Sequence, residues 1–130
     1  MGGPQVTLVD ASSWIEFLRG RTSEPGRRVK SLLIRGQAAW CDMTLVELWN
    51  GARGKAEKDV LEALEREVRI YPITEQVWAG ACELARRCRN EGLTVPSTDI
   101  IIAACATVHK LELEHCDRHF EGILPLARKT

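Results

Sequence analysis

The segment Val6–Leu18, VTLVDASSWIEFL, combines the two patterns that decide the fold class. Its first four residues are apolar or β-branched, which predicts a short buried strand that ends at Asp10. Ser12 and Ser13 are good N-cap residues for a following helix. The apolar residues of that helix would be Trp14, Ile15, Phe17 and Leu18. A strand followed at once by a helix is typical of an α/β domain.

The rest of the chain repeats this alternation, so we expect a mostly parallel sheet within a single domain, residues 1–130. Further strands are predicted at residues 38–41, 69–73 and 111–115, and residues 123–126 are a candidate for a last strand. Helices are predicted over residues 27–35, 56–68 and 100–108, and two more would be opened by Thr44 and Thr74. Pro72 favours an edge position for the strand that contains it.

Composition limits the class of protein. Hydrophobic residues make up 45% of the 130 residues, and eighteen basic residues balance eighteen acidic ones. This excludes a disordered chain and a strongly basic nucleic-acid-binding coat. The longest apolar run, residues 100–108, is far shorter than the ~20 residues of a membrane-spanning helix, so no membrane partner and a cytoplasmic location are expected. Five cysteines without a Cys-x-x-Cys pair indicate neither a disulfide framework nor a zinc ribbon.

Four acidic residues occupy the ends of predicted elements: Asp10, Glu47, Asp99 and Asp117. Ligands of open α/β sheets bind outside the carboxyl ends of the strands, so these carboxylates are expected to converge. Two carboxylates about 4 Å apart repel by about 4 kcal/mol at an effective dielectric constant of 20. They need a cation or bound protons to share a pocket. Oxygen ligands favour Mg²⁺ or Mn²⁺, which would activate water for phosphodiester hydrolysis.

Each acid also has a purely structural interpretation. Thr44 and Glu47 match a capping box. Asp99 suits the first turn of a helix, where the helix dipole favours an acid. Asp117 suits a turn, and Asp10 suits an N-cap. The joint pattern, rather than any single residue, therefore favours a functional site.

Four segments resemble the motifs of PIN-domain ribonucleases, specifically the VapC-type toxins of type II toxin–antitoxin systems. They are Leu8–Leu18, Thr44–Ala52, Pro96–Ala104 and His115–Phe120, and they occur in the family's order over nearly the whole chain. The resemblance implies a PIN-like three-layer α/β/α sandwich with a mostly parallel central sheet. It also implies endonucleolytic cleavage of RNA with Mg²⁺ or Mn²⁺.

The resemblance assigns roles to the four acids. Asp10 and Asp99 would be the most direct metal ligands, and Asp117 would complete the metal shell directly or through water. Glu47 would orient or deprotonate the attacking water. Supporting positions are Ser12, which would hold the carboxylate of Asp10, together with Thr44, Thr98 and His115.

The remaining expectations concern partners and alternatives. Arg19 and Arg53 are candidate RNA contacts, because an acidic pocket needs nearby positive charge to approach a polyanion. The resemblance implies a cognate VapB-type antitoxin and a homodimer.

An alternative is a catalytically silent PIN-like module that binds RNA or protein. A zinc site built from His115, Cys116 and His119 would lack a fourth ligand. The segment 111–114 is more acidic than the family's usual apolar run.

Overall fold

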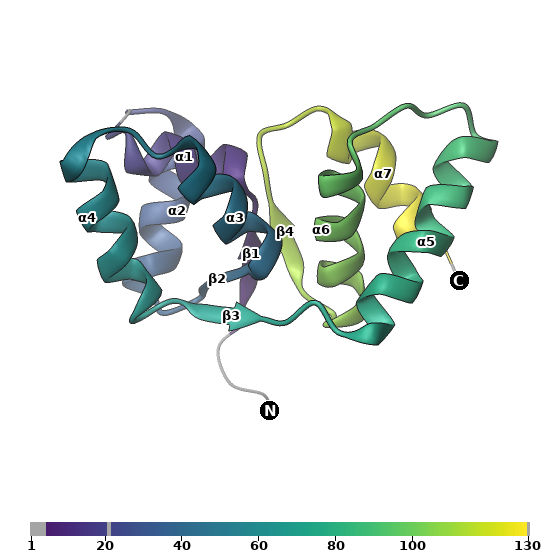
Figure 1. Ribbon diagram of the computed structural model, residues 1–130, viewed down its shortest axis with the longest axis horizontal. Coiled ribbons are helices and arrows are strands. Elements are labelled where there is room, and N and C mark those ends of the chain that lie inside the picture. Colours follow the sequence, from purple (N-terminus) through teal and green to yellow (C-terminus); the bar gives the residue numbers. More distant parts are fainter. Residues whose placement is uncertain (1–4, 21, 130) are drawn as a thin grey trace.

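The computed structural model describes residues 5–20 and 22–129 and contains one four-stranded parallel sheet flanked by helices (Figure 1). The strands are β1 (Thr7–Val9), β2 (Ala38–Cys41), β3 (Arg69–Tyr71) and β4 (Glu112–Glu114), in the order β3-β2-β1-β4. The helices are α1 (Ala11–Leu18), α2 (Glu24–Ile34), α3 (Asp42–Gly51), α4 (Gly54–Glu65), α5 (Glu75–Asn90), α6 (Ser97–Val108) and α7 (His119–Ala127). The predicted α/β class is confirmed.

Helices cover both faces of the sheet, as is usual for a parallel sheet. The side chains of each strand alternate between these two faces. Leu8 and Ala39 point into a core shared with α5, α6 and α7. Val9 and Trp40 point into a second core, built with α1 to α4. Figure 1 shows these two groups of helices on opposite sides of the sheet, which makes the three layers of the predicted sandwich. Among the helices of the described ranges, none has the length and apolarity needed to cross a membrane.

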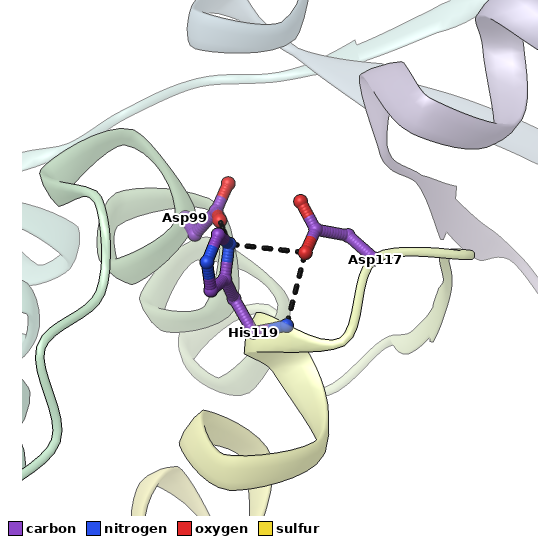
Figure 2. A group of neighbouring side chains, drawn as sticks. All are labelled: Asp99, Asp117 and His119. Carbon is purple, nitrogen blue, oxygen red and sulfur yellow. Dashed lines mark hydrogen bonds and ion pairs between the residues drawn. The ribbon is translucent and has the colours of Figure 1, made fainter.

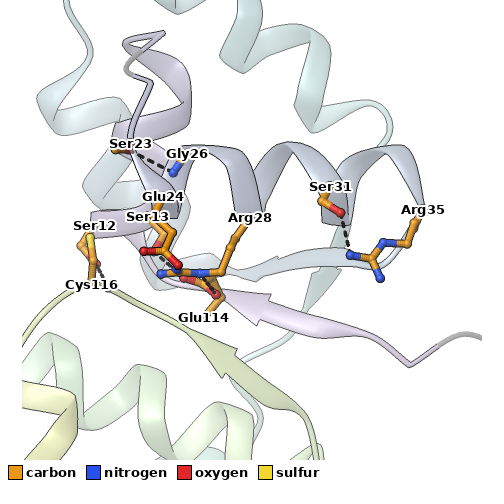
Figure 3. A network of polar contacts seen from close by, with 10 residues as sticks. All are labelled: Ser12, Ser13, Ser23, Glu24, Gly26, Arg28, Ser31, Arg35, Glu114 and Cys116. Atoms are coloured by element: carbon orange, nitrogen blue, oxygen red, sulfur yellow. Dashed lines mark hydrogen bonds and ion pairs between the residues drawn. The ribbon is translucent and has the colours of Figure 1, made fainter.

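The acidic fourth strand is accommodated at an edge of the sheet. β4 pairs only with β1 among the described strands, which leaves one side of it open. Glu114 accepts a hydrogen bond from Arg28 of α2 at 2.9 Å and another from Ser13 Oγ at 3.3 Å (Figure 3). Glu112 is exposed. Neither carboxylate is buried without a partner, so the two acids do not carry the cost of an unpaired buried charge. An acidic strand is therefore compatible with this edge position.

The prediction of a strand at residues 123–126 is wrong, because these residues belong to α7. Phe120, Ile123 and Leu126 lie three residues apart and are all buried in the same core. That spacing places them on one helical face, so tertiary burial decides the outcome despite Pro125 inside the helix.

The beginnings of several helices also differ from the prediction, among them those of α1, α2 and α3. The N-cap of α1 is Asp10 rather than a serine, which confirms the structural interpretation of this acid. α2 begins at Glu24, with Ser23 as N-cap, three residues before the predicted start. α3 begins at Asp42, so Thr44 lies inside the helix and the predicted capping box is wrong. Glu47 is therefore free of the capping role.

The order of the strands determines where a ligand can bind. The chain passes from β1 to β2 and β3 on one side, and β4 returns to the other side of β1. The backbone N–H of Asp10 donates to the carbonyl of Glu114 at 2.9 Å, so the ends of β1 and β4 lie side by side. A crevice at such a switch point, beyond the carboxyl ends of the strands, is the usual ligand site of an open α/β sheet.

Candidate active site

Asp10 lies at this switch point and is held by its own helix. Its carboxylate caps α1 by accepting from the backbone N–H of Ser12 at 3.1 Å. Ser12 Oγ donates to the same oxygen, Oδ2, at 2.7 Å and accepts from the backbone N–H of Cys116 at 3.2 Å. Ser12 therefore links Asp10 to the chain that follows β4, and Figure 3 shows its contact with Cys116. The predicted supporting position of Ser12 agrees with these contacts.

Asp99, Asp117 and His119 form a group of potential metal-binding side chains whose ligand atoms all lie within 4.8 Å of one another (Figure 2). Asp99 lies in the first turn of α6, Asp117 lies between β4 and α7, and His119 begins α7. His119 Nδ1 is 3.0 Å from Asp99 Oδ2 and 3.0 Å from Asp117 Oδ1. The backbone N–H of His119 also donates to Asp117 Oδ1 at 2.9 Å.

Glu47 approaches the site from α3, one turn beyond the end of β2. Its Oε1 atom is buried and has no hydrogen-bond partner among the described residues. Burial, followed by the charges of Asp10 and Asp99, raises the pKa of Glu47 to about 7. An unpartnered buried carboxylate oxygen is costly unless a cation or another donor contacts it.

The four acids are close enough to repel one another. Burial is the main cause that raises the pKa of Asp10, and the charge of Asp117 adds to it against the hydrogen bonds from Ser12. Burial and the charges of Asp10 and Asp117 raise the pKa of Asp99, while His119 lowers it. Asp10 is 3% exposed and Asp99 7% exposed. Buried, mutually repelling carboxylates with one orphaned oxygen fit a divalent cation.

The other predicted site residues make contacts with residues other than the four acids. His115 packs its ring against Phe120 at a centroid distance of 5.0 Å. Thr44 is buried, with Oγ1 3.5 Å from Cys41 Sγ, so its contacts lie within the turn that begins α3. Arg19 pairs with Glu57 at 3.5 Å, and Arg53 is exposed at the N-cap of α4, where its backbone N–H donates to Glu57. Thr98 is half-buried beside Asp99.

Sequence reasoning did not assign His119 to the acidic site. It considered this histidine only with His115 and Cys116 for zinc, whereas the structure groups it with Asp99 and Asp117. Its position two residues after Asp117, at the start of a helix, was the available signal. A chain that turns into a helix directly after the fourth strand brings both side chains to the same crevice.

The raised carboxyl pKa values predict an unusual pH dependence of stability. A carboxyl group with a raised pKa binds more protons in the folded than in the unfolded state, so the free energy of unfolding falls as pH rises. For Glu47 this loss of stability takes place between pH 4.5 and about pH 7. Within that range one proton changes the free energy of unfolding by at most ~1.4 kcal/mol per pH unit. Melting temperatures with a chelator should fall between pH 5 and pH 8, and Glu47→Gln should flatten the curve. A wild-type curve as flat as that of the variant would contradict the assignment.

Comparison with known proteins is consistent with the geometry. The PIN domain family model matches residues 7–123. Ribonuclease VapC21 of Mycobacterium tuberculosis is 31% identical over 105 residues, which cover 78% of this chain and 76% of the relative. Ribonuclease VapC11 of the same organism is 30% identical over 120 residues, or 89% of this chain and 90% of the relative.

Solved structures show the same fold. A chain in the crystal structure of VapBC2 from Rickettsia felis, bound to a DNA fragment from its promoter, superposes with a TM-score of 0.78 at 15% identity. The match covers 94% of this chain and 95% of the other. A chain of FitAcB from Neisseria gonorrhoeae gives a TM-score of 0.72 at 26% identity, over 94% and 93% of the two chains.

Proposed function

Because this chain belongs to the PIN-domain family, and within it to the VapC ribonucleases of toxin–antitoxin systems, we propose that it cleaves RNA at the acidic site described above. The observation that carries this proposal is the convergence of Asp10, Glu47, Asp99 and Asp117 at the switch point of the sheet. Relatives named as ribonucleases argue against the alternative of a silent binding module.

We assign a role to each acid from its surroundings. Asp10, Asp99 and Asp117 would hold Mg²⁺ or Mn²⁺, with the Asp10 carboxylate fixed by Ser12. A bound ion of this kind activates water and neutralises charge on a phosphodiester. Glu47 Oε1, which has no donor among the described residues, would accept a proton from the attacking water.

The RNA strand has a path across the site. A surface depression of about 810 Å³ lies beside the acids and is lined by Asp117, Arg118 and His119 together with the loop at residues 93–95. Phosphate contacts position a nucleic acid without reading its sequence. Arg118 at the depression and the exposed Arg53 at the start of α4 are suited to this role, whereas Arg19 is already paired with Glu57.

We propose two protein partners for this chain, an antitoxin that inhibits it and a second copy of the same chain. The structural neighbours are chains of toxin–antitoxin complexes, which supports a VapB-type antitoxin as partner. Homodimerisation is supported by large apolar side chains left exposed on helices, namely Val46, Trp49 and Trp78. We also propose a cytoplasmic location, because the proposed RNA substrate is found there.

Metal removal tests the proposed function directly. The purified chain should cleave RNA with Mg²⁺ or Mn²⁺, EDTA should stop cleavage, and restoring the ion should restore it. The measurement is the loss of a labelled RNA and the appearance of fragments on a denaturing gel. A parallel reaction with DNA of the same sequence reports the substrate class. Cleavage that continues in EDTA would contradict a metal-dependent nuclease.

A further inference from the structure

We propose that His119 Nδ1 is a ligand of the metal ion, and that this nitrogen shifts the preference of the site from Mg²⁺ towards a first-row transition ion such as Mn²⁺. The inference rests on the proposed function, because it concerns the same acidic site. It goes further by predicting which ion the site selects and which residue makes the selection.

The ring of His119 lies at the distance of a metal ligand from its two carboxylate neighbours. His119 Nδ1 lies 3.0 Å from an oxygen of each of two carboxylates, Asp99 and Asp117, which come from different elements (Figure 2). Ligand atoms of these three residues all lie within 4.8 Å of one another. Neighbouring ligands of an octahedral ion with bonds of about 2.1 Å are separated by about 3.0 Å. The ring nitrogen therefore has the spacing of a ligand without any movement of the backbone.

The imidazole of His119 can exchange its hydrogen bonds to the carboxylates for a bond to an ion. The side chain of His119 is 45% exposed, so solvent can accept a hydrogen bond from Nε2 while Nδ1 offers its lone pair to an ion. The backbone N–H of His119 donates to Asp117 Oδ1 at 2.9 Å, which fixes the start of α7 against this carboxylate. The ring is thus attached to the same turn that positions an acid of the site.

A nitrogen ligand changes which ion the site prefers. Mg²⁺ prefers oxygen ligands, keeps several waters and is rarely bound by imidazole. Imidazole nitrogen strengthens binding of ions along the first transition row, beginning with Mn²⁺. A site of carboxylates alone would leave Mg²⁺ and Mn²⁺ closely matched. Replacing one oxygen ligand by Nδ1 of His119 makes the donor set mixed and favours the transition ion.

The same geometry also suits a different role. A protonated His119 would hold Asp99 and Asp117 together by two ion pairs at 3.0 Å and would be displaced when an ion binds. In that case nitrogen would not contact the metal. The two roles are separated by a measurement that detects nitrogen bound to the ion, independently of cleavage.

The test uses the full chain loaded with Mn²⁺ and electron spin-echo envelope modulation. Wild type should show modulation from an imidazole nitrogen, and labelling histidine with ¹⁵N should change its pattern. His119→Gln should abolish it, while His109→Gln and His115→Gln should retain it. His109 is a matched control because its Nε2 pairs with the carbonyl of Pro72 at 3.0 Å on another part of the surface. His115 tests the other nearby imidazole.

Calorimetric titration with each ion gives the second readout. The ratio of the Mg²⁺ and Mn²⁺ dissociation constants should fall about tenfold or more in His119→Gln. His119→Asp should restore tight binding with an oxygen ligand but not the preference for Mn²⁺. Unchanged modulation and an unchanged ratio in His119→Gln would overturn the inference, and a wild type without nitrogen modulation would do the same.

Asp99→Asn separates this inference from the proposed function. If Asp99→Asn abolishes Mn²⁺ binding while His119→Gln alters neither readout, the acidic site stands and His119 is only a counter-charge. If wild type binds neither ion in a carboxylate-dependent way, the proposed function fails together with the inference.

Discussion

Asp99→Asn should reduce RNA cleavage about a thousandfold or more while the protein remains folded. The substitution keeps the size and hydrogen-bonding shape of the side chain but removes one negative charge beside Asp117 and His119. A metal site that loses an anionic ligand loses both affinity for the ion and stabilisation of charge on the phosphodiester. A loss of about 4 kcal/mol in transition-state stabilisation corresponds to this factor.

Stability should move in the opposite direction to activity. Asp99 is 7% exposed, and burial together with the charges of Asp10 and Asp117 raises its pKa. A neutral amide removes this repulsion, so the metal-free variant should melt at or above the temperature of wild type near pH 7.5. The measurements are initial cleavage rates at saturating Mn²⁺ and melting curves with EDTA.

Asp59→Asn provides the matched control for the charge change. Asp59 lies on α4, is largely exposed and pairs with Lys55 at 2.8 Å. An exposed pair of this kind contributes little to stability. Asp59→Asn should therefore leave cleavage, growth inhibition and melting unchanged. If both variants cleave RNA like wild type, the chemistry takes place elsewhere on the protein.

Trp40→Ala should destabilise the protein by about 3–5 kcal/mol, which is a large part of the stability of a small domain. Trp40 is 0% exposed in the middle of β2 and packs against Trp14, with ring centroids 4.8 Å apart. Its removal opens a cavity between the sheet and α1, the helix that Asp10 caps. The same substitution should therefore loosen the carboxylate of Asp10 relative to the other acids.

Urea denaturation followed by circular dichroism measures this effect. The comparison is best made in the Asp99→Asn background, because an inactive toxin does not limit expression. Ile34→Ala is the control, since Ile34 is 76% exposed at the end of α2 and its truncation should cost about 0.5 kcal/mol or less. Equal denaturation midpoints for the two variants would show that Trp40 does not support the core as the structure indicates.

Much of the fold was predictable from local pattern. Short β-branched or apolar runs predicted β1 and β2, and the apolar spacing after Thr74 predicted α5 with its correct N-cap. The prediction failed for residues 123–126, where four residues alone do not distinguish a strand from a buried helix. Burial of Phe120, Ile123 and Leu126 in a common core decided for the helix.

The candidate site was predictable in part for the same reason. Acids that follow strands must lie near the carboxyl edge of a parallel sheet, so Asp10 and Asp117 were expected to meet. Glu47 was ambiguous, because the Thr44–Glu47 spacing equally predicts a capping box. The actual start of α3 at Asp42 removed this ambiguity, and spacing alone cannot specify a helix start to within two residues.

The sequence alone determined the α/β class, the alternation of strands and helices, and the four acids at element ends. These features depend on residue types and on spacings of a few residues. Tertiary structure decided that β4 lies on the far side of β1, that Asp99 lies close enough to Asp10 and Asp117 to be repelled by them, and that His119 contacts Asp99 and Asp117. Distances between residues remote in the chain depend on how the whole sheet and its helices pack. The geometry of a site whose residues come from several elements is therefore fixed only when all of those elements have packed.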